Sequence, residues 1–280
     1  MSSADQYAVF GNPIRHSKSP EIHAAFAAQS GQKMVYRTHL VEDGLFDESA
    51  RRFFANGGRG LNITVPCKVD AFRYADTLSD RARRAGAVNT LARQDDGSIY
   101  GDNTDGAGIV RDMLENLAWE VGNRRVLILG AGGAVRGILG PLLARKPSHV
   151  VIANRTVDKA RDLAREFAEL GEVRGCSYEG LAGSQFDIVI NGTSASMSGE
   201  LPPLPPQLLS DSACCYDMMY AANPTPFMHW AAAEAAWAVS DGLGMLVEQA
   251  AESFCIWRGI RPETTPVIEQ IRASLSKGES

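Results

Sequence analysis

The sequence predicts an α/β protein with two lobes, the first an α/β domain and the second a Rossmann-like, doubly wound domain. Three observations support this prediction. The chain has 280 residues, more than the ~100 to 200 that one domain usually takes. Strand patterns alternate with helical patterns along most of it, which is typical of α/β proteins. The run Arg125–Leu129 is apolar after its first residue, as expected of a strand buried on both faces of a parallel sheet.

The first lobe is predicted to begin with a strand, a loop and a helix. The strand pattern ends at Asn12-Pro13, and Ser19 followed by Pro20 predicts the N-cap of a helix. Pro66 ends a later strand because proline cannot donate to a sheet ladder. The turn 95–97 predicts a hairpin. In order, the predicted elements are strand 7–11, helix 19–29, strand 35–40, helix 45–55, strand 60–65, helices 67–73 and 78–83, and strands 87–92 and 98–101.

The second lobe is predicted to follow a helix that Asp105 caps and that runs to about Leu117. Strand and helix then repeat at the spacing of βαβ crossovers, which favours a doubly wound sheet. The predicted elements are strand 125–129, helix 134–144, strand 149–153, helix 157–169, strand 188–190, a proline-rich loop 201–206, strand 213–217, helix 226–235, strand 238–240 and helices 245–258 and 263–275. The pattern alone does not assign the last two helices to a lobe.

Composition and charge exclude several classes of protein. Hydrophobic residues make up 45% and charged residues 22% of the chain, the balance of a globular protein. Lys and Arg total 28 against 33 Asp and Glu, with no long basic run, so no nucleic-acid partner is expected. No apolar stretch approaches the ~20 residues of a membrane helix, and the first residues lack a basic, apolar leader. We therefore expect a cytoplasmic protein without a membrane partner.

Cysteine and histidine spacing does not predict a metal site. The five cysteines include no C-x-x-C pair, and the five histidines include no H-E-x-x-H pair. Reduced and mostly buried thiols are the interpretation of the cysteines. The residues that carry out the reaction are therefore expected among the other side chains.

A glycine-rich turn follows the strand 125–129 directly and precedes a helix. In such a turn glycines permit a tight bend and let backbone N–H groups approach a pyrophosphate at the helix N-terminus. A tight turn without a ligand is the alternative interpretation. Val135 stands where the usual fingerprint has Gly or Ala, so we expect looser packing of helix on strand or a different turn. The turn consists of Gly130, Ala131, Gly132, Gly133 and Ala134.

The residues after the strand 149–153 favour NADP over NAD. An NAD site would place a carboxylate about twenty residues beyond the glycine turn, but this chain has Asn154, Arg155 and Thr156 there. Arg155 can pair with the 2′-phosphate of NADP, Thr156 can donate a hydroxyl, and Lys159 adds charge one helical turn later. A solvated loop followed by an ordinary helix is the alternative.

Polar side chains of the first lobe gather where predicted strands end, which is where open α/β sheets bind ligands. With a lysine, they could hold a small polyhydroxylated carboxylic acid. Each residue taken alone also has a structural explanation, such as a helix cap or a solvated lysine. The set comprises Ser17, Ser19, Asn62, Thr64, Lys68, Asn89, Thr90 and residues 102–105.

Read in order, these segments resemble the shikimate dehydrogenase family. The similarity spans nearly the whole chain, and its glycine turn, G-A-G-G-A, is closer to the family's turn than to the usual fingerprint. In the first lobe the matching stretches are 7–14, 16–20, 62–68, 85–90 and 101–106. In the second lobe they are 130–134, 136–137, 154–156, 191–194, 216–220, 241–242 and 249–251.

The resemblance implies the reversible reduction of 3-dehydroshikimate to shikimate with NADPH, a step of aromatic amino-acid biosynthesis. It implies that Lys68 is the catalytic acid and base and that Asp105 is its partner, at a cleft between the lobes. It also implies a discontinuous substrate domain of residues 1–105 and 242–280, and an NADP-binding domain of residues 106–241. The implied substrate ligands are Ser17, Ser19, Asn62, Thr64, Lys68, Asn89, Asp105, Tyr220 and Gln249. The implied NADP contacts are the glycine turn, Asn154, Arg155, Thr156, Lys159, Met218 and Gly242.

Alternatives stay open at this stage. A quinate/shikimate dehydrogenase that uses NAD as readily as NADP is the nearest, and Thr156, Lys159 and the missing acid argue against it. A folate dehydrogenase or a tRNA-linked reductase would not be expected to carry the first-lobe set. A nucleotide-binding regulatory module without catalysis is the alternative from another class. The sequence leaves the oligomeric state open, with a homodimer among the options.

Overall fold

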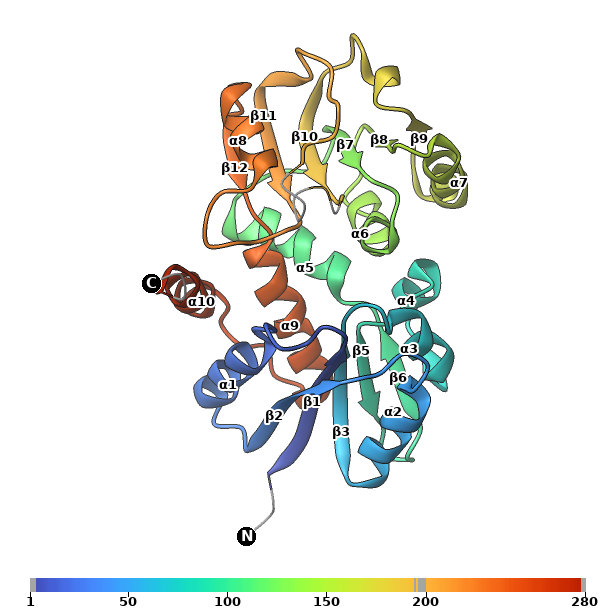
Figure 1. The fold of residues 1–280 in the computed structure, drawn as a ribbon, viewed down its shortest axis with the longest axis vertical. Coiled ribbons are helices and arrows are strands. Elements are labelled where there is room, and N and C mark those ends of the chain that lie inside the picture. The colour runs from blue at the N-terminus through green and yellow to red at the C-terminus, as the bar shows by residue number, and fades with distance from the viewer. Residues whose placement is uncertain (1–3, 194, 196–199, 278–280) are drawn as a thin grey trace. The chain divides into compact units, whose positions relative to one another are not determined.

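The computed structural model describes residues 4–193, 195 and 200–277, and these divide into two units. The first unit contains the residues up to Gly108 and a later segment of the chain, Val247–Ala273. The second contains Ile109–Leu246 and the end of the chain from Ser274. Figure 1 shows each unit built around its own sheet. Ser194, which closes one of the matching stretches, lies outside the described residues.

The sheet of the first unit is mixed, with strand order β2-β1-β3-β5-β6-β4. Strand β1 pairs in parallel with β2 and β3, whereas β5 pairs antiparallel with β3 and β6. Its strands are β1 (Asp5–Gly11), β2 (Met34–Leu40), β3 (Gly58–Ile63), β4 (Thr77–Leu78), β5 (Thr90–Arg93) and β6 (Ile99–Asp102). Its helices are α1 (Ser19–Ser30), α2 (Phe46–Ala55), α3 (Lys68–Tyr74), α4 (Asp80–Ala85), the start of α5 (Asp105–Arg111), and most of α9 (Leu243–Arg258) and α10 (Thr265–Lys277).

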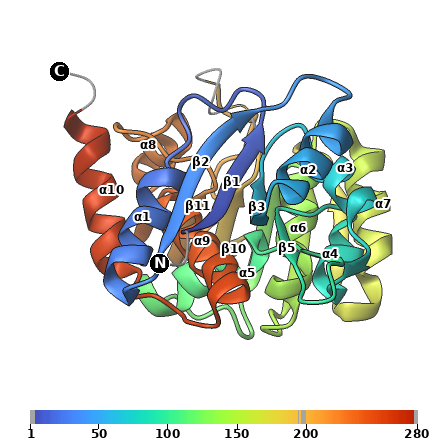
Figure 2. The same ribbon diagram turned by 90° about the horizontal axis from the view of Figure 1, so that it is seen from below.

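Alternate residues of β1 and β3 face opposite layers, because successive side chains of a strand point to opposite faces. Ala8 and Phe10 pack in one core with Phe46 of α2 and Ala71 of α3. On the other side the ring of Tyr7 lies 4.8 Å from that of Trp257 in α9. Figure 2 shows α1 and α9 on one side of β1 and β2, and α2 and α3 on the other. The C-terminal chain therefore shares with α1 the cover of one face of the first sheet.

The sheet of the second unit is wholly parallel, with strand order β12-β11-β10-β7-β8-β9. Numbered within the unit, this is the 3-2-1-4-5-6 order of dinucleotide-binding sheets, and it confirms the predicted doubly wound sheet. Its strands are β7 (Arg125–Leu129), β8 (His149–Ala153), β9 (Val173–Cys176), β10 (Phe186–Asn191), β11 (Leu209–Asp217) and β12 (Ala238–Ser240). Its helices are α6 (Gly133–Leu143), α7 (Val157–Phe167) and α8 (Pro226–Ala233), and a π-helical turn (Asp112–Asn116) continues α5.

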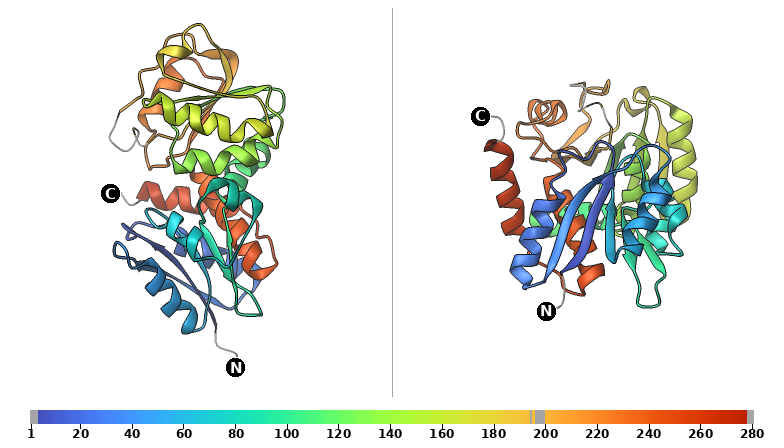
Figure 3. Two further views of the ribbon diagram at one scale, coloured as in Figure 1. Left: turned by 90° about the vertical axis from the view of Figure 1, so that its right-hand side faces the viewer. Right: turned by 60° about the horizontal axis from the view of Figure 1, so that its bottom comes forward.

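Both faces of this sheet are buried, as the continuous apolar strands predict. Val126 and Ile128 belong to the core that α6 and α7 cover, whereas Leu127 and Leu129 belong to the core that α8 covers. Figure 3 shows α6 and α7 side by side.

Some predicted elements need correction. Strands β4 and β9 were not predicted. The predicted helix 105–117 is regular only to Arg111 and then widens into the π-helical turn. Ser19 was predicted as an N-cap, but Lys18 holds that position and Ser19 is the first helical residue. The Ser19 hydroxyl forms a hydrogen bond with Tyr36 instead, so it does not cap the helix. Asp105 is likewise the first residue of α5 and not a cap before it.

Candidate active site

Lys68 and Asp105 form an ion pair at the starts of two helices of the first unit. The Lys68 Nζ atom lies 2.5 Å from Asp105 Oδ2. The side chains are 28% and 12% exposed, so the pair is only partly screened by water and its attraction is stronger than that of an open surface pair. A proton donor and its counter-ion are thus fixed beside each other while the lysine can still be reached from solvent.

Asn89 joins this pair to the C-terminal helix. It lies directly before β5 and is 2% exposed. Its Nδ2 donates to the second oxygen of Asp105, Oδ1, at 2.7 Å, and lies 3.3 Å from Gln249 Oε1 on α9. The structure therefore brings together four residues that the sequence analysis singled out: Lys68, Asn89, Asp105 and Gln249.

Asn62, at the end of β3, lies next to Asn89 but is enclosed by other polar groups. Its Oδ1 accepts the Tyr36 hydroxyl at 2.8 Å, and its Nδ2 lies 3.3 Å from the backbone oxygen of Asn89. Burial, which the bond with Ser19 opposes, raises the pKa of Tyr36 well above its ordinary value, so Tyr36 is a neutral donor at physiological pH.

Ser17, Ser19 and Thr64 flank this part of the site. The Ser19 backbone N–H donates to Ser17 Oγ at 3.3 Å, and the Ser19 hydroxyl bonds Tyr36. Thr64 follows β3, with its backbone N–H donating to Phe10 O at 2.9 Å. The two serines therefore connect through Tyr36 to Asn62.

Three polar residues of this region, His23, Tyr36 and Ser253, were not predicted from the sequence as site residues, whereas Thr90 belongs to the predicted polar set. His23 and Tyr36 contact the Asn62 amide, and Thr90 and Ser253 contact each other behind Asn89. Ser253 lies four residues after Gln249, which places both on one face of a helix. That spacing could have identified Ser253. No comparable short-range signal marks His23 or Tyr36.

In the second unit the glycine turn stands between β7 and α6, as predicted. Gly130 has φ +101°, a left-handed conformation that favours glycine. Gly132 is the N-cap of α6, and a Cβ added at Gly132 or Gly133 would meet no protein atom within 4 Å. Packing therefore does not require these two glycines. Instead they leave backbone N–H groups at a helix N-terminus open to an anion.

Val135 packs closely, so of the two expectations, looser packing or a different turn, the first is wrong. It is fully buried, and a Cβ added at Gly192 would lie 2.5 Å from Val135 Cγ2. Gly192, directly after β10, provides the space that a glycine at position 135 would otherwise provide. The same added Cβ would lie 3.2 Å from Met218 Sδ, and a Cβ at Gly130 would lie 3.1 Å from Gly192 O, so Gly192 lies between Met218 and the glycine turn.

Arg155, Thr156 and Lys159 stand exposed at the end of β8 and the start of α7. Asn154 shapes this turn by donating from Nδ2 to Thr156 O at 2.9 Å. Neither Arg155 nor Lys159 forms an ion pair within residues 4–193, 195 and 200–277. The two cations thus have charge available for an anionic ligand, which suits the 2′-phosphate of NADP.

Met218, Tyr220 and Gly242 lie together where β11 and β12 end. Gly242 N–H donates to Met219 O at 2.9 Å, and a Cβ at Gly242 would lie 2.3 Å from Met218 O. Burial raises the pKa of Tyr220 above its ordinary value. With the glycine turn on the other side of Gly192 from Met218, the predicted cofactor residues of β7, β11 and β12 occupy the carboxyl edge of one sheet.

Cys214 and Cys215, both in β11, have thiols with raised pKa values. Burial raises the pKa of Cys214 to about 11 and that of Cys215 to about 12. All five cysteines are unpaired. Because the thiolate is the reactive form, this burial disfavours nucleophilic chemistry at Cys214 and Cys215.

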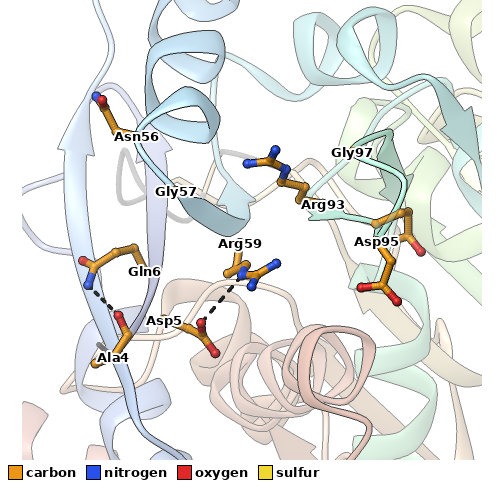
Figure 4. A pocket seen from close by; sticks show the side chains of 10 residues that line it. Ala4, Asp5, Gln6, Asn56, Gly57, Arg59, Arg93, Asp95 and Gly97 are labelled. Atoms are coloured by element: carbon orange, nitrogen blue, oxygen red, sulfur yellow. Dashed lines mark hydrogen bonds and ion pairs between the residues drawn. The ribbon is translucent and has the colours of Figure 1, made fainter. Parts of the chain in front are cut away.

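A polar cavity of about 500 Å³ lies at the opposite end of the first sheet (Figure 4). Gln6 and Gly57 line it at the amino ends of β1 and β3, and Arg59 extends toward Asp5. It contains none of the predicted site residues. None of the helices in the described part of the chain combines the length and apolar character that a bilayer span requires.

Comparison with protein families gives three matches along the chain. Residues 9–91 match the shikimate dehydrogenase substrate binding domain. Residues 112–198 match the shikimate / quinate 5-dehydrogenase family, and residues 242–272 match the shikimate 5′-dehydrogenase C-terminal domain.

Individual relatives are similar over almost their full length. The shikimate dehydrogenase (NADP(+)) of Cellvibrio japonicus is 60% identical over 271 residues, which cover 97% of this chain and 98% of the relative. The crystal structure of an enzyme from Pseudomonas putida has a TM-score of 0.91 and 47% identity, covering 95% of this chain and 98% of that one. The shikimate 5-dehydrogenase of Thermus thermophilus, in complex with NADP(H) and shikimate, has a TM-score of 0.86 and 30% identity, covering 97% and 100%.

Proposed function

Because the chain belongs to the shikimate dehydrogenase family, we propose that it catalyses the reversible reduction of 3-dehydroshikimate to shikimate with NADPH. The observation that carries this proposal is the Lys68–Asp105 pair, bonded through Asn89 toward Gln249. We assign residues 1–105 and 242–280 to substrate binding and residues 106–241 to NADP binding.

Lys68 is the proposed proton donor. NADPH, when bound, supplies the hydride. As negative charge develops on the carbonyl oxygen, the Lys68 ammonium donates its proton there, and in the reverse direction Lys68 accepts the proton of the hydroxyl. Asp105 holds the ammonium through the 2.5 Å contact, and Asn89 holds the other carboxylate oxygen.

The remaining polar residues fit a small, polyhydroxylated carboxylic acid, because they offer paired donors and acceptors beside one cation. We propose that the side chains that bind substrate with Lys68 and Asp105 are those of Ser17, Ser19, Asn62, Thr64, Asn89, Tyr220 and Gln249. The proposed NADP contacts are Gly130, Ala131, Gly132, Gly133, Ala134, Asn154, Arg155, Thr156, Lys159, Met218 and Gly242.

A set of four activity assays tests the proposal. Purified protein is mixed with shikimate or quinate, each with NADP or NAD, and nicotinamide absorbance is followed. Strong signal with shikimate and NADP alone supports the proposed function. Comparable rates with quinate or NAD favour the enzyme of relaxed specificity, and no activity in any mixture favours the nucleotide-binding module.

Lys68→Ala tests the catalytic role. A positioned general acid or base typically contributes ~10²- to 10⁴-fold to the rate, so we expect kcat to fall at least about 100-fold. The Michaelis constant for shikimate should change much less. Lys33→Ala, an exposed lysine between α1 and β2, is the control. Intact turnover in Lys68→Ala would remove Lys68 from catalysis.

Arg155→Gln tests cofactor choice. Loss of a charge-assisted contact at an exposed site should weaken NADP binding by about tenfold and leave NAD binding nearly unchanged. Titration of each cofactor by fluorescence measures this. Arg161→Gln, on the same helix as Lys159 but ion-paired with Asp158, is the control. An equal loss for both cofactors would contradict pairing with the 2′-phosphate.

The cytoplasmic location stays a prediction, and a homodimer stays one option for the oligomeric state. Light scattering on the purified chain tests the second.

A further inference from the structure

Two fully buried hydroxyl side chains lie behind the Lys68–Asp105 pair. Thr90 begins β5 and Ser253 lies on α9, and both are 0% exposed. Their oxygens are 2.7 Å apart. Neither belongs to the proposed catalytic or substrate-binding set. Buried hydroxyls are costly unless they are hydrogen-bonded, so their arrangement is informative.

The orientation of the Asn89 amide is fixed by its partners. The Thr104 backbone N–H can only donate, and it lies 2.9 Å from Asn89 Oδ1. The Asp105 carboxylate in its ion pair only accepts, and it lies 2.7 Å from Asn89 Nδ2. Oxygen and nitrogen of the amide are therefore assigned by chemistry.

The Asn62 amide is fixed in the same way. Its Nδ2 faces the backbone oxygen of Asn89, which only accepts, at 3.3 Å. The same Nδ2 donates to Ser253 Oγ at 2.9 Å. Asn62 is thus a donor toward Ser253.

With both amides fixed, the direction of the hydroxyl protons follows. Thr90 Oγ1 lies 2.9 Å from Asn89 Oδ1, an acceptor, so Thr90 donates its single proton there. At the 2.7 Å contact Thr90 then accepts and Ser253 donates. The competing acceptor of Ser253, Gln249 O, lies farther away at 3.0 Å.

The donors consequently point one way, from Asn62 to Ser253, Thr90, Asn89 and Asp105. We propose that Thr90 and Ser253 are positioning residues, which hold the Asn89 amide with Nδ2 toward Asp105 and thereby hold Asp105 on Lys68. This inference rests on the proposed function. Without the Thr90 proton, Asn89 Oδ1 keeps only the two Thr104 donors, the backbone N–H at 2.9 Å and the hydroxyl at 3.1 Å. The amide is then held less firmly with Nδ2 toward Asp105.

Thr90→Val and Thr90→Ser form the matched pair of variants. Valine keeps the shape and removes the hydroxyl, whereas serine keeps the hydroxyl and removes a methyl group. We expect kcat for shikimate oxidation to fall about tenfold in Thr90→Val, which corresponds to one oriented hydrogen bond. Thr90→Ser should stay within about threefold of the wild type. The affinity for NADP, measured by fluorescence, should be unchanged in both.

A double-mutant cycle separates positioning from a merely structural role. If Thr90 acts through Asn89, then Thr90→Val should have little further effect on kcat in an Asn89→Ala background. An equal loss in both backgrounds, or wild-type kcat in Thr90→Val, overturns the inference. Ser253→Ala, on a different element, goes through the same cycle and decides the matter if Thr90→Val does not fold.

Failure of the proposed function has a different signature. A wild-type chain that is inactive with shikimate and NADP overturns the proposed function, and with it the role of Thr90. An active wild type with an insensitive Thr90 overturns only the inference.

Discussion

At the scale of single residues, His23 shows how burial sets a charge state. Its ring is fully buried, Nε2 lies 3.0 Å from Asn62 Oδ1, and Nδ1 has no partner among the described residues. Because Oδ1 accepts, Nε2 carries the proton and the ring is neutral. Burial, which the bond to Asn62 only partly offsets, lowers the pKa of His23 to about 3.

This charge state predicts a pH dependence of stability. The ordinary pKa of histidine is about 6.5, so below that pH the unfolded chain takes up a proton that the folded chain refuses until about pH 3. Stability attributable to His23 is therefore present above pH 6.5 and lost as pH falls, by at most ~1.4 kcal/mol per unit. His23→Gln should be less stable than the wild type at pH 7, but should lose less stability between pH 7 and pH 4. Urea unfolding at several pH values measures the difference.

His16→Gln is the matched control, because His16 is exposed. It should follow the wild-type pH dependence. Parallel curves for His23→Gln and the wild type would show that His23 takes up its proton in the folded state. No pattern in the sequence separates His23 from the other histidines, because its partners Asn62 and Tyr36 are distant in the chain and no spacing relates them.

At the scale of elements, two glycines of the second unit follow strands, Gly132 after β7 and Gly192 after β10, and the structure gives them different roles. Gly132 has φ −88° and open space where a Cβ would stand. At Gly192 a Cβ would lie 2.5 Å from Val135 Cγ2, in the core. One glycine is suited to ligand approach, and the other to packing.

Gly132→Ala should therefore affect cofactor binding, and Gly192→Ala should affect stability. Gly132→Ala should leave the free energy of unfolding within about 1 kcal/mol and weaken NADP binding. Gly192→Ala overpacks the core and should cost ~1 to 3 kcal/mol of stability. Chemical denaturation and cofactor titration of both variants test this. Undiminished NADP affinity in Gly132→Ala would contradict a role of the glycine turn in binding the pyrophosphate.

The predicted elements show where short-range patterns suffice. Strands β7 and β8 have the predicted bounds because their apolar runs are continuous. Strand β9 was missed because it is short, carries Arg174 and Gly175, and has no apolar run. Its pairing depends on tertiary packing: a Cβ at Gly175 would lie 2.4 Å from the backbone of Ala160 in α7. The π-helical turn was missed for the same reason, since Asp112 is held there by a 2.6 Å bond from Tyr216 in β11.

At the scale of the whole molecule, the chain order explains what the sequence could and could not predict. The motifs of the site were visible because each is local, from the glycine turn to the residues around Lys68. The return of α9 to the first unit was not visible in periodicity and came only from the resemblance. The network behind Asn89 likewise joins residues 62, 89, 90 and 253, a separation that no local pattern spans.

The return of the C-terminal chain predicts that the first unit depends on it for folding. Trp257 donates from Nε1 to Leu91 O at 2.9 Å, and its indole fills the space that a side chain at Gly60 would need. Phe254, on the same helix, is fully buried. A chain that ends at Leu246 lacks these groups and leaves part of one face of β1 and β3 uncovered. We expect its first unit to lose cooperative folding while its second unit, which ends at that residue apart from the last few of the chain, stays folded.

Hydrogen exchange measured by mass spectrometry tests this unit by unit. In the shortened chain, amides of residues 5–11 and 58–63 should exchange rapidly, because a sheet that has lost part of the cover of one face opens readily. Amides of residues 125–129 and 186–191 should keep their protection. Trp257→Ala in the full chain should show a partial effect confined to the first unit, at a cost below the ~3 to 5 kcal/mol typical of a fully buried aromatic residue, because Trp257 is half-buried. Protection of residues 5–11 that survives the truncation would mean that α1 to α4 suffice to hold the sheet, and that the C-terminal helix contributes Gln249 and Ser253 to the site without being needed for the fold.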